Sequence, residues 1–131
     1  MGSVQAQRLK ESDLPAIVLQ HFGEQYPTAK HVTWEKEGPA YEAEFVLNHV
    51  ETSVLYGQDG VLLQTETELP VSALPQAVRA YCAQHMPGKK IKEAARIIEP
   101  SGHTLFEAEI DGKDYLFETD GTPVSSTDTK R

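Results

Sequence analysis

YEAEF (Tyr41–Phe45) and FEAEI (Phe106–Ile110) are nearly the same five residues, and both occur in one chain of 131 residues. In each stretch apolar residues alternate with glutamates, which is the period of a β-strand that is buried on one face. The aromatic, alanine and last apolar side chains are expected to face a core, and the two glutamates to face away from it. The repetition predicts one strand-containing unit that occurs twice.

The repetition continues on both sides of these stretches. An offset of 60 pairs Ser72, Leu74, Pro75, Val78, Pro87 and Lys90 with Ser12, Leu14, Pro15, Val18, Pro27 and Lys30. An offset of 61 pairs Leu116, Phe117, Asp120 and Gly121 with Leu55, Tyr56, Asp59 and Gly60. Self-similarity at a fixed offset indicates a duplicated structural unit. We therefore expect two repeats, residues 13–71 and 72–124, in a single compact domain with flexible tails at 1–12 and 125–131.

Each repeat opens with a Leu-Pro pair that predicts the start of a helix, because proline is tolerated at the first helical position. Apolar residues then follow at helical spacing: Leu14, Ile17, Val18, Phe22 and Tyr26 in the first repeat, and Leu74, Val78, Cys82 and Met86 in the second. Pro27 and Pro87 end the helices. An apolar stripe needs a flat partner, so we predict an α+β fold with two helices on one face of a mostly antiparallel sheet of roughly eight strands.

Two-residue turns at Asn48-His49 and at Asp111-Gly112 would fix the register of two hairpins. The predicted pairs are Leu47–Val50, Phe45–Thr52, Ala43–Val54 and Tyr41–Tyr56 in the first hairpin, and Ile110–Lys113, Ala108–Tyr115 and Phe106–Phe117 in the second. The first hairpin is then longer by two pairs, and this even difference keeps every side chain on its face. Leu47, Asn48, His49 and Val50 are expected to protrude as a tip.

The sheet face away from the helices is predicted to be open and acidic, with scattered aliphatic side chains at Val46, Leu55, Leu105 and Leu116. Its acidic residues are Glu42, Glu44, Glu51, Glu107, Glu109, Asp114 and Glu118, and the hairpin strands add no basic residue to it. Trp34 lies on the strand before the first hairpin, and its facing is not fixed by the pattern. It is either a core residue beneath the helix or an aromatic anchor for a partner.

The paired glutamates also allow a catalytic interpretation. Residues i and i+2 of a strand lie about 6.5 Å apart, near the separation of the two carboxylates in inverting glycosidases. The sequence gives no sign of an apolar pocket that would raise the pKa of one carboxyl alone. Glutamates are also usual on the wet face of an antiparallel sheet. A binding face is therefore favoured, and a small hydrolase stays an alternative.

Composition narrows the classes of function. Twelve Lys and Arg against twenty Asp and Glu give a formal charge of −8, without the clustered cations that nucleic acid or an anionic membrane requires. Basic proteins, peptides and metal cations fit this charge. The five histidines have no metal-binding spacing, and Cys82 is interpreted as a small core residue. No cofactor and no metal site is predicted, and no apolar run approaches the roughly 18 residues of a membrane helix.

The first residues bear on location. Ser3-Val4-Gln5-Ala6-Gln7 resembles the small-residue region at a secretory cleavage site. We expect a periplasmic or secreted protein. The alternative is that Met1-Gly2-Ser3 is an expression leader before an ordinary tail.

Taken together, these residues resemble the PepSY-like, β-lactamase-inhibitor-like family. The resemblance rests on Leu14-Pro15, Tyr26-Pro27, Ala29-Lys30, Val32, Trp34-Glu35, YEAEF and Asp59-Gly60, and it spans about residues 13–124. It implies an exported bacterial protein of unestablished function, in which two helix-plus-four-strand repeats form one curved antiparallel sheet. It also implies an inhibitor-like contact through a concave sheet and a hairpin tip, here Asn48-His49. This tip has no acidic residue of the kind that such an inhibitor inserts into its target.

The sequence therefore favours a non-enzymatic, exported binding module for a protein or peptide, with a cationic partner indicated by the charge. The candidate binding residues are Trp34, Glu42, Glu44, Leu47, Asn48, His49, Glu107 and Glu109. A small hydrolase that uses a carboxylate pair and a structural cation-binding domain are the alternatives.

Overall fold

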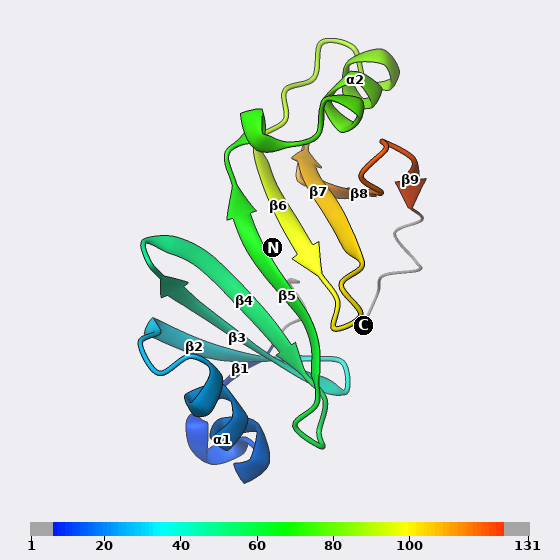
Figure 1. The fold of residues 1–131 in the computed structure, drawn as a ribbon. Coiled ribbons are helices and arrows are strands. Elements are labelled where there is room, and N and C mark those ends of the chain that lie inside the picture. Colours follow the sequence, from blue (N-terminus) through cyan, green and yellow to red (C-terminus); the bar gives the residue numbers. More distant parts are fainter. Residues whose placement is uncertain (1–6, 125–131) are drawn as a thin grey trace. The chain divides into compact units, whose positions relative to one another are not determined.

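The computed structural model describes residues 7–124, which divide into two compact units with a boundary between Thr65 and Glu66 (Figure 1). The first unit contains β1 (Gln7–Leu9), the short 3-10 helix η1 (Glu11–Asp13), α1 (Ala16–Gln25), β2 (Lys30–Glu37), β3 (Ala40–Leu47) and β4 (Val50–Tyr56). The boundary falls inside β5 (Leu62–Leu69), whereas the sequence repeats meet at residues 71 and 72. The second unit contains η2 (Val71–Ala73), α2 (Gln76–His85), β6 (Glu93–Ile98), β7 (Thr104–Ile110), β8 (Lys113–Phe117) and β9 (Pro123–Val124).

Within residues 7–124 the nine strands are hydrogen-bonded in the order in which they follow along the chain. The pairings of β1 to β4, and those of β6 to β9, are all antiparallel. Short connections between neighbouring strands favour this arrangement, because only antiparallel strands can be joined by a tight turn. The predicted α+β class with an antiparallel sheet is confirmed.

Proline sets both ends of each helix. The two helices have ten residues each and begin directly after Pro15 and Pro75. They end at Gln25 and His85, and the next residues, Tyr26 and Met86, both leave the helical region at φ −133° and ψ 62°. The proline that follows each of these residues excludes the helical conformation there. Neither described helix is long and apolar enough to cross a lipid bilayer.

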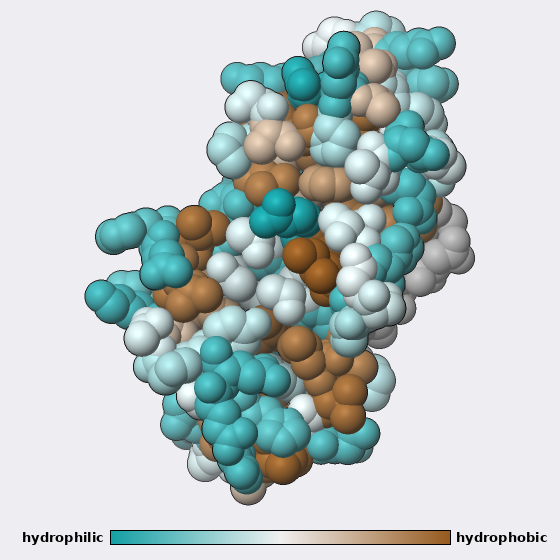
Figure 2. Space-filling model, viewed as in Figure 1, coloured by the Kyte–Doolittle hydropathy of each residue, from teal (hydrophilic) through white to brown (hydrophobic). Residues whose placement is uncertain are grey.

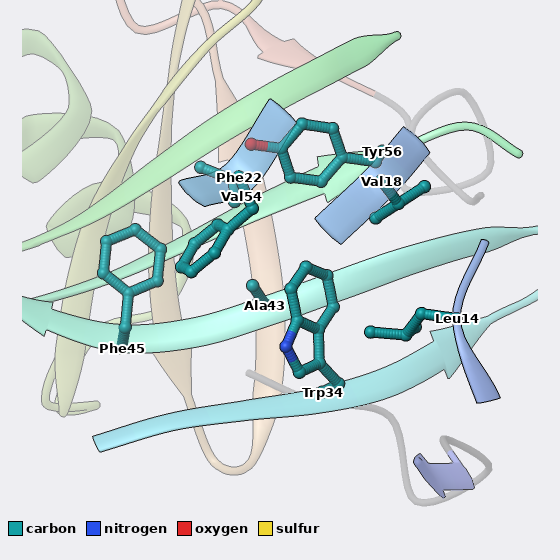
Figure 3. Close-up of a cluster of buried hydrophobic side chains, with 8 residues drawn as sticks. All are labelled: Leu14, Val18, Phe22, Trp34, Ala43, Phe45, Val54 and Tyr56. Atoms are coloured by element: carbon teal, nitrogen blue, oxygen red, sulfur yellow. The ribbon is translucent and has the colours of Figure 1, made fainter. Parts of the chain in front are cut away.

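The first unit closes around an aromatic core beneath α1 (Figure 3). Its buried residues are Leu14, Val18, Phe22, Trp34, Ala43, Phe45, Val54 and Tyr56. The Phe22 ring meets the rings of Trp34 and Phe45 edge to face, with centroids 5.2 Å apart in both pairs. Trp34 is 3% exposed. Of its two interpretations, the structure therefore selects the core residue, and Trp34 is not an anchor on the surface.

The second unit repeats this arrangement with smaller side chains. Its core contains Leu74, Val78, Cys82, Ala94, Ala108, Ile110 and Phe117. Cys82 stands where the first unit has Phe22, and Ala94 stands where it has Trp34. Tyr81 fills part of the remaining space, because its ring packs edge to face on Phe117 at 5.3 Å. Burial raises the pKa of the Cys82 thiol, which makes it a poor nucleophile.

Gly60 and Gly121 occupy turns that lie directly beneath the helices. Their φ angles are +82° and +89°, values that side chains disfavour. A Cβ atom at Gly60 would lie 2.8 Å from Cγ1 of Ile17, and one at Gly121 would lie 2.8 Å from the carbonyl oxygen of Ala77. His21 adds a hydrogen bond from Nδ1 to the Gly60 carbonyl at 2.6 Å. The repeated Asp-Gly of the sequence is thus a close contact between turn and helix.

β1 corrects the predicted flexible tail over residues 1–12. Leu9 lies opposite Trp34 and packs against the first core, while Arg8 lies opposite Glu35 on the other face. A strand of three residues is too short to show an alternating pattern in the sequence. The remaining parts of the predicted tails, residues 1–6 and 125–131, lie outside the described residues.

Candidate functional site

The β3–β4 hairpin ends in the predicted two-residue turn. All the predicted pairs from Leu47–Val50 to Tyr41–Tyr56 are present. Asn48 and His49 have φ angles of 52° and 69°, the left-handed values of a type I′ turn. Both turn residues are exposed and Val50 is 38% exposed, whereas Leu47 packs partly against the first core. Figure 2 shows hydrophobic residues between hydrophilic ones at this end of the hairpin.

The β7–β8 hairpin is shorter by two pairs, as predicted. Seven pairs join β3 to β4, and five join β7 to β8. In the second hairpin the buried Ile110 directly precedes the turn at Asp111, and Lys89 Nζ lies 2.7 Å from the Asp111 carboxylate. In the first hairpin the last fully buried residue of β3 is Phe45, two residues further from its turn. The first tip therefore extends beyond its own core, and the second does not.

The face of the first unit away from α1 is acidic, but it is not open along its whole length. Glu42 is 5% exposed, and Leu55, which lies opposite it on β4, is 2% exposed. The alternation of a strand predicts which face a side chain takes, but it does not predict whether that face is covered. Glu42 is therefore not available to a partner in this structure. The inverting-hydrolase interpretation also loses support, because it needs two carboxylates open to one substrate.

Three carboxylates gather on this face of the first unit. Glu35 and Glu37 on β2 and Glu42 on β3 each place an oxygen within 4.8 Å of the others, and Arg8 Nε lies 4.0 Å from Glu35 Oε2. Carboxylate oxygens are the ligands that Ca²⁺ and Mg²⁺ prefer, so this group could hold a hard cation. Sequence reasoning misses Glu35 and Glu37 because the facing of β2 is not fixed by its pattern. Their i, i+2 spacing is the signal that could have revealed them.

Glu44 is half-buried among other carboxylates. Burial raises the pKa of its carboxyl, and the negative charges of Glu35 and Glu51 raise it further, whereas Arg8 opposes the rise. A like charge disfavours the ionised form in the same direction as the loss of water does. Glu44 therefore takes up a proton more readily than an exposed glutamate.

In the second unit the predicted binding residues Glu107 and Glu109 are half-buried. Glu109 lies between Glu93 and Asp114 on the neighbouring strands, so an acidic row crosses β6, β7 and β8. The other end of the same face carries a small hydrophobic cluster of Ile97, Leu105, Leu116 and Val124. The first three of these residues are buried, so this end of the face is not open to solvent.

His103, which lies outside the predicted set, contacts two carboxylates of the second unit. Its Nε2 lies 2.9 Å from Glu118 Oε1, and its Nδ1 lies 3.0 Å from Glu99 Oε1. The hydrogen bonds to Glu118 and Glu99, together with the charges of these residues, raise the pKa of His103. A shallow depression beside it is lined by Gly102, His103, Thr104, Glu118, Thr119 and Asp120. The i, i+4 spacing of Glu99 and His103 was visible in the sequence, but Glu118 joins them only through the fold.

The sequence of the chain matches the model of one protein family. The model of the family described as "Putative beta-lactamase-inhibitor-like, PepSY-like" matches residues 3–64 and again residues 46–120. Two overlapping matches agree with the internal repeat. No curated protein matches the chain.

Solved structures of Bacteroides proteins have the same fold. A protein of Bacteroides eggerthii described as periplasmic superimposes with a TM-score of 0.76 at 21% identity, over 86% of each chain. A DUF2874 family protein of Bacteroides uniformis gives 0.74 at 22% identity, over 85% of this chain and 86% of the other. A protein of Bacteroides fragilis described as BLIP-like gives 0.66 at 23% identity, over 86% of this chain and 84% of the other.

Proposed function

Because the chain belongs to the PepSY-like family, whose description is inhibitor-like, we propose that it is a non-enzymatic binding module that presents the β3–β4 tip to a protein or peptide. One structural neighbour is described as BLIP-like and another as periplasmic. Those descriptions belong to the neighbours. They support a binding role for this chain, and a place of action outside the cytoplasm.

The observation that carries the proposal is the tip itself. Asn48, His49 and Val50 are exposed, and they lie beyond the last fully buried residue of β3, Phe45. Interfaces gain most of their energy from a few central side chains ringed by polar groups. An imidazole beside an exposed valine, at the end of a rigid hairpin, offers such a centre without the entropy cost of ordering a flexible loop.

The partner is proposed to be cationic. The net charge of the chain is −8, and the exposed Glu51 and the half-buried Glu44 lie on the strands that lead to the tip. Glu107 and Glu109 are the corresponding half-buried glutamates of the second unit. Trp34 and Glu42 are left out of the contact surface, because both are buried.

The test is a comparison of two hairpin variants as bait. The parent, the double variant Asn48→Asp with His49→Gly, and the control Asp111→Asn are immobilised and exposed to exported proteins of the source organism. Asp-Gly is a preferred pair in a type I′ turn, so the double variant keeps the hairpin. A partner retained by the parent and identified by mass spectrometry should bind the double variant at least tenfold more weakly, about 1.4 kcal/mol by calorimetry. The control changes the other tip and should bind like the parent.

Two results would count against the proposal. Equal affinity of the parent and the double variant would place the binding surface elsewhere. Robust turnover of glycosides, esters or peptides, abolished by Glu44→Gln, would favour the hydrolase alternative.

A further inference from the structure

A single imidazole joins two turns of the second unit. Glu99 follows β6 and begins the loop that leads to β7, whereas Glu118 follows β8 and begins the turn that leads to β9. The two ring nitrogens of His103 contact the carboxylates of these residues, at 3.0 Å and 2.9 Å. The side chain of His103 therefore connects the β6–β7 loop to the β8–β9 turn.

The geometry of this connection requires a charged imidazole. A neutral imidazole has one N–H group, and an ionised carboxylate can only accept hydrogen bonds. Both contacts of His103 can be hydrogen bonds only when both ring nitrogens carry a proton. Each bond is then charge-assisted and stronger than a neutral one.

We propose that His103 is a pH-operated latch, which fastens the β6–β7 loop to the β8–β9 turn when it is protonated and releases the loop when it is not. This inference is independent of the proposed binding role of the β3–β4 tip.

The duplication supplies an internal comparison. In the first unit β2 and β3 are joined by the two residues Gly38-Pro39, since Glu37 lies opposite Ala40. In the second unit Ile98 lies opposite Thr104, so the corresponding loop has five residues, 99–103. The offset of 61 places Gly57 at the position of Glu118. The first unit therefore joins β2 to β3 without residues that correspond to Glu99, His103 and Glu118. The latch is a feature of the second unit that the repeated pattern does not contain.

Each of the two turns is held by bonds of its own. The Glu99 amide donates to the His103 carbonyl at 3.0 Å, and the Gly102 amide donates to the Glu99 carbonyl at 2.8 Å. The Glu118 amide donates to the Thr122 carbonyl at 2.8 Å in the other turn. Loss of the latch would therefore leave the local turns formed and change how the loop is held against the β8–β9 turn. The two turns form the walls of the shallow depression beside His103.

The direction of the pH response follows from the groups around the ring. Glu118 and Glu99 raise the pKa of His103 above its ordinary value, and Asp120 lines the same depression with a pKa lowered by hydrogen bonds from Thr122. The latch is therefore fully closed below about pH 6.5, the ordinary histidine value. It opens as the pH rises through the raised pKa of His103.

The test is a nuclear magnetic resonance titration of the whole chain. The ring signals of His103 and the backbone order parameters of Gly102, His103 and Thr104 are followed with pH in the parent, Glu118→Gln and His103→Gln. In the parent the order parameters should fall as the His103 ring loses its proton, while those of Gly38, in the unlatched turn of the first unit, stay constant. Glu118→Gln should lower the pKa of the ring. His103→Gln should show low order parameters at every pH.

The titration of the parent needs no variant to fold, so the proposal stays testable if a substitution fails. Loop order parameters that stay constant while the His103 ring titrates would overturn it. A loop that responds to pH in the same way in His103→Gln would overturn it as well.

Discussion

Glu44 keeps its carboxyl half-buried beside two other negative charges, and this has a measurable effect on stability. Its pKa is raised in the folded chain by burial and by Glu35 and Glu51. The folded state therefore holds the proton more tightly than the unfolded state, so this group lowers stability as the pH rises from about its ordinary value of 4.5. Glu44→Gln should raise the free energy of unfolding at pH 7 by up to about 1 kcal/mol, since solvent screens part of the effect.

Urea denaturation at pH 7 and at pH 4 checks this prediction. The increase in the free energy of unfolding should be absent at pH 4, where the Glu44 carboxyl of the parent is already largely protonated. Glu11→Gln is the matched control, because Glu11 is an exposed glutamate. An equal gain at both pH values would show that charge is not the cause.

The residue level also shows where sequence reasoning stops. The faces of Phe45, Ala43 and Glu42 follow from alternation and are confirmed. The burial of Glu42 does not follow, because it depends on what lies over the face rather than on the strand itself. His103 is missed for the same reason, since its partner Glu118 is fifteen residues away along the chain.

The turn–helix contacts at Gly60 and Gly121 allow a prediction about elements. Both glycines have positive φ, so alanine at either position costs about 1–2 kcal/mol in backbone strain. At Gly60 the nearest atom is a side-chain carbon of Ile17, which can move, whereas at Gly121 it is the backbone oxygen of Ala77. Gly121→Ala should therefore destabilise the chain more than Gly60→Ala does, by roughly a further 1–3 kcal/mol for the overpacked contact.

Chemical denaturation of four variants separates the free-energy cost of backbone strain from the cost of the close contact at the added Cβ atom. Gly88→Ala and Gly102→Ala are the controls, because these glycines also have positive φ but no neighbour within 4 Å of a Cβ atom. They should show the backbone cost alone. A loss at Gly121 no larger than theirs would mean that α2 moves away without cost.

The sequence predicts well those helices and strands whose hydrophobic pattern occurs in both repeats and ends at a proline or a turn. It does not predict the short strands that lack such a pattern. The two hairpin registers follow from two-residue turns and are confirmed pair by pair. β1 has three residues and β9 has two, so neither shows a period that could be recognised. The five-residue loop between β6 and β7 has no equivalent of the same length in the first unit. An alignment of the two halves shows where this loop lies but not which contacts it makes.

For the whole chain, the charge of −8 predicts how a cationic partner would associate. The association rate constant should fall with added salt, because the screening length shortens to about 8 Å at physiological ionic strength. Glu44→Gln with Glu109→Gln should lower the rate constant by roughly two- to fivefold at low salt and flatten its salt dependence. Surface plasmon resonance across a salt series measures both quantities.

The control is Glu11→Gln with Glu24→Gln, which removes the same charge from exposed positions outside the strands. If it slows association equally, net charge steers the partner and the strand glutamates have no special part. An association rate that does not change with salt would contradict a cationic partner altogether.

The hairpin difference of two pairs has a consequence for how far such a tip can reach. A two-residue turn must be flanked by a hydrogen-bonded pair, and such pairs alternate with non-hydrogen-bonded ones along an antiparallel ladder. A hairpin that keeps this turn can therefore lengthen only by two pairs at a time, or about 7 Å at 3.4 Å per residue. The length of the hairpin can therefore change in related chains only in steps of two residue pairs. Such a change moves the tip without altering the core beneath α1.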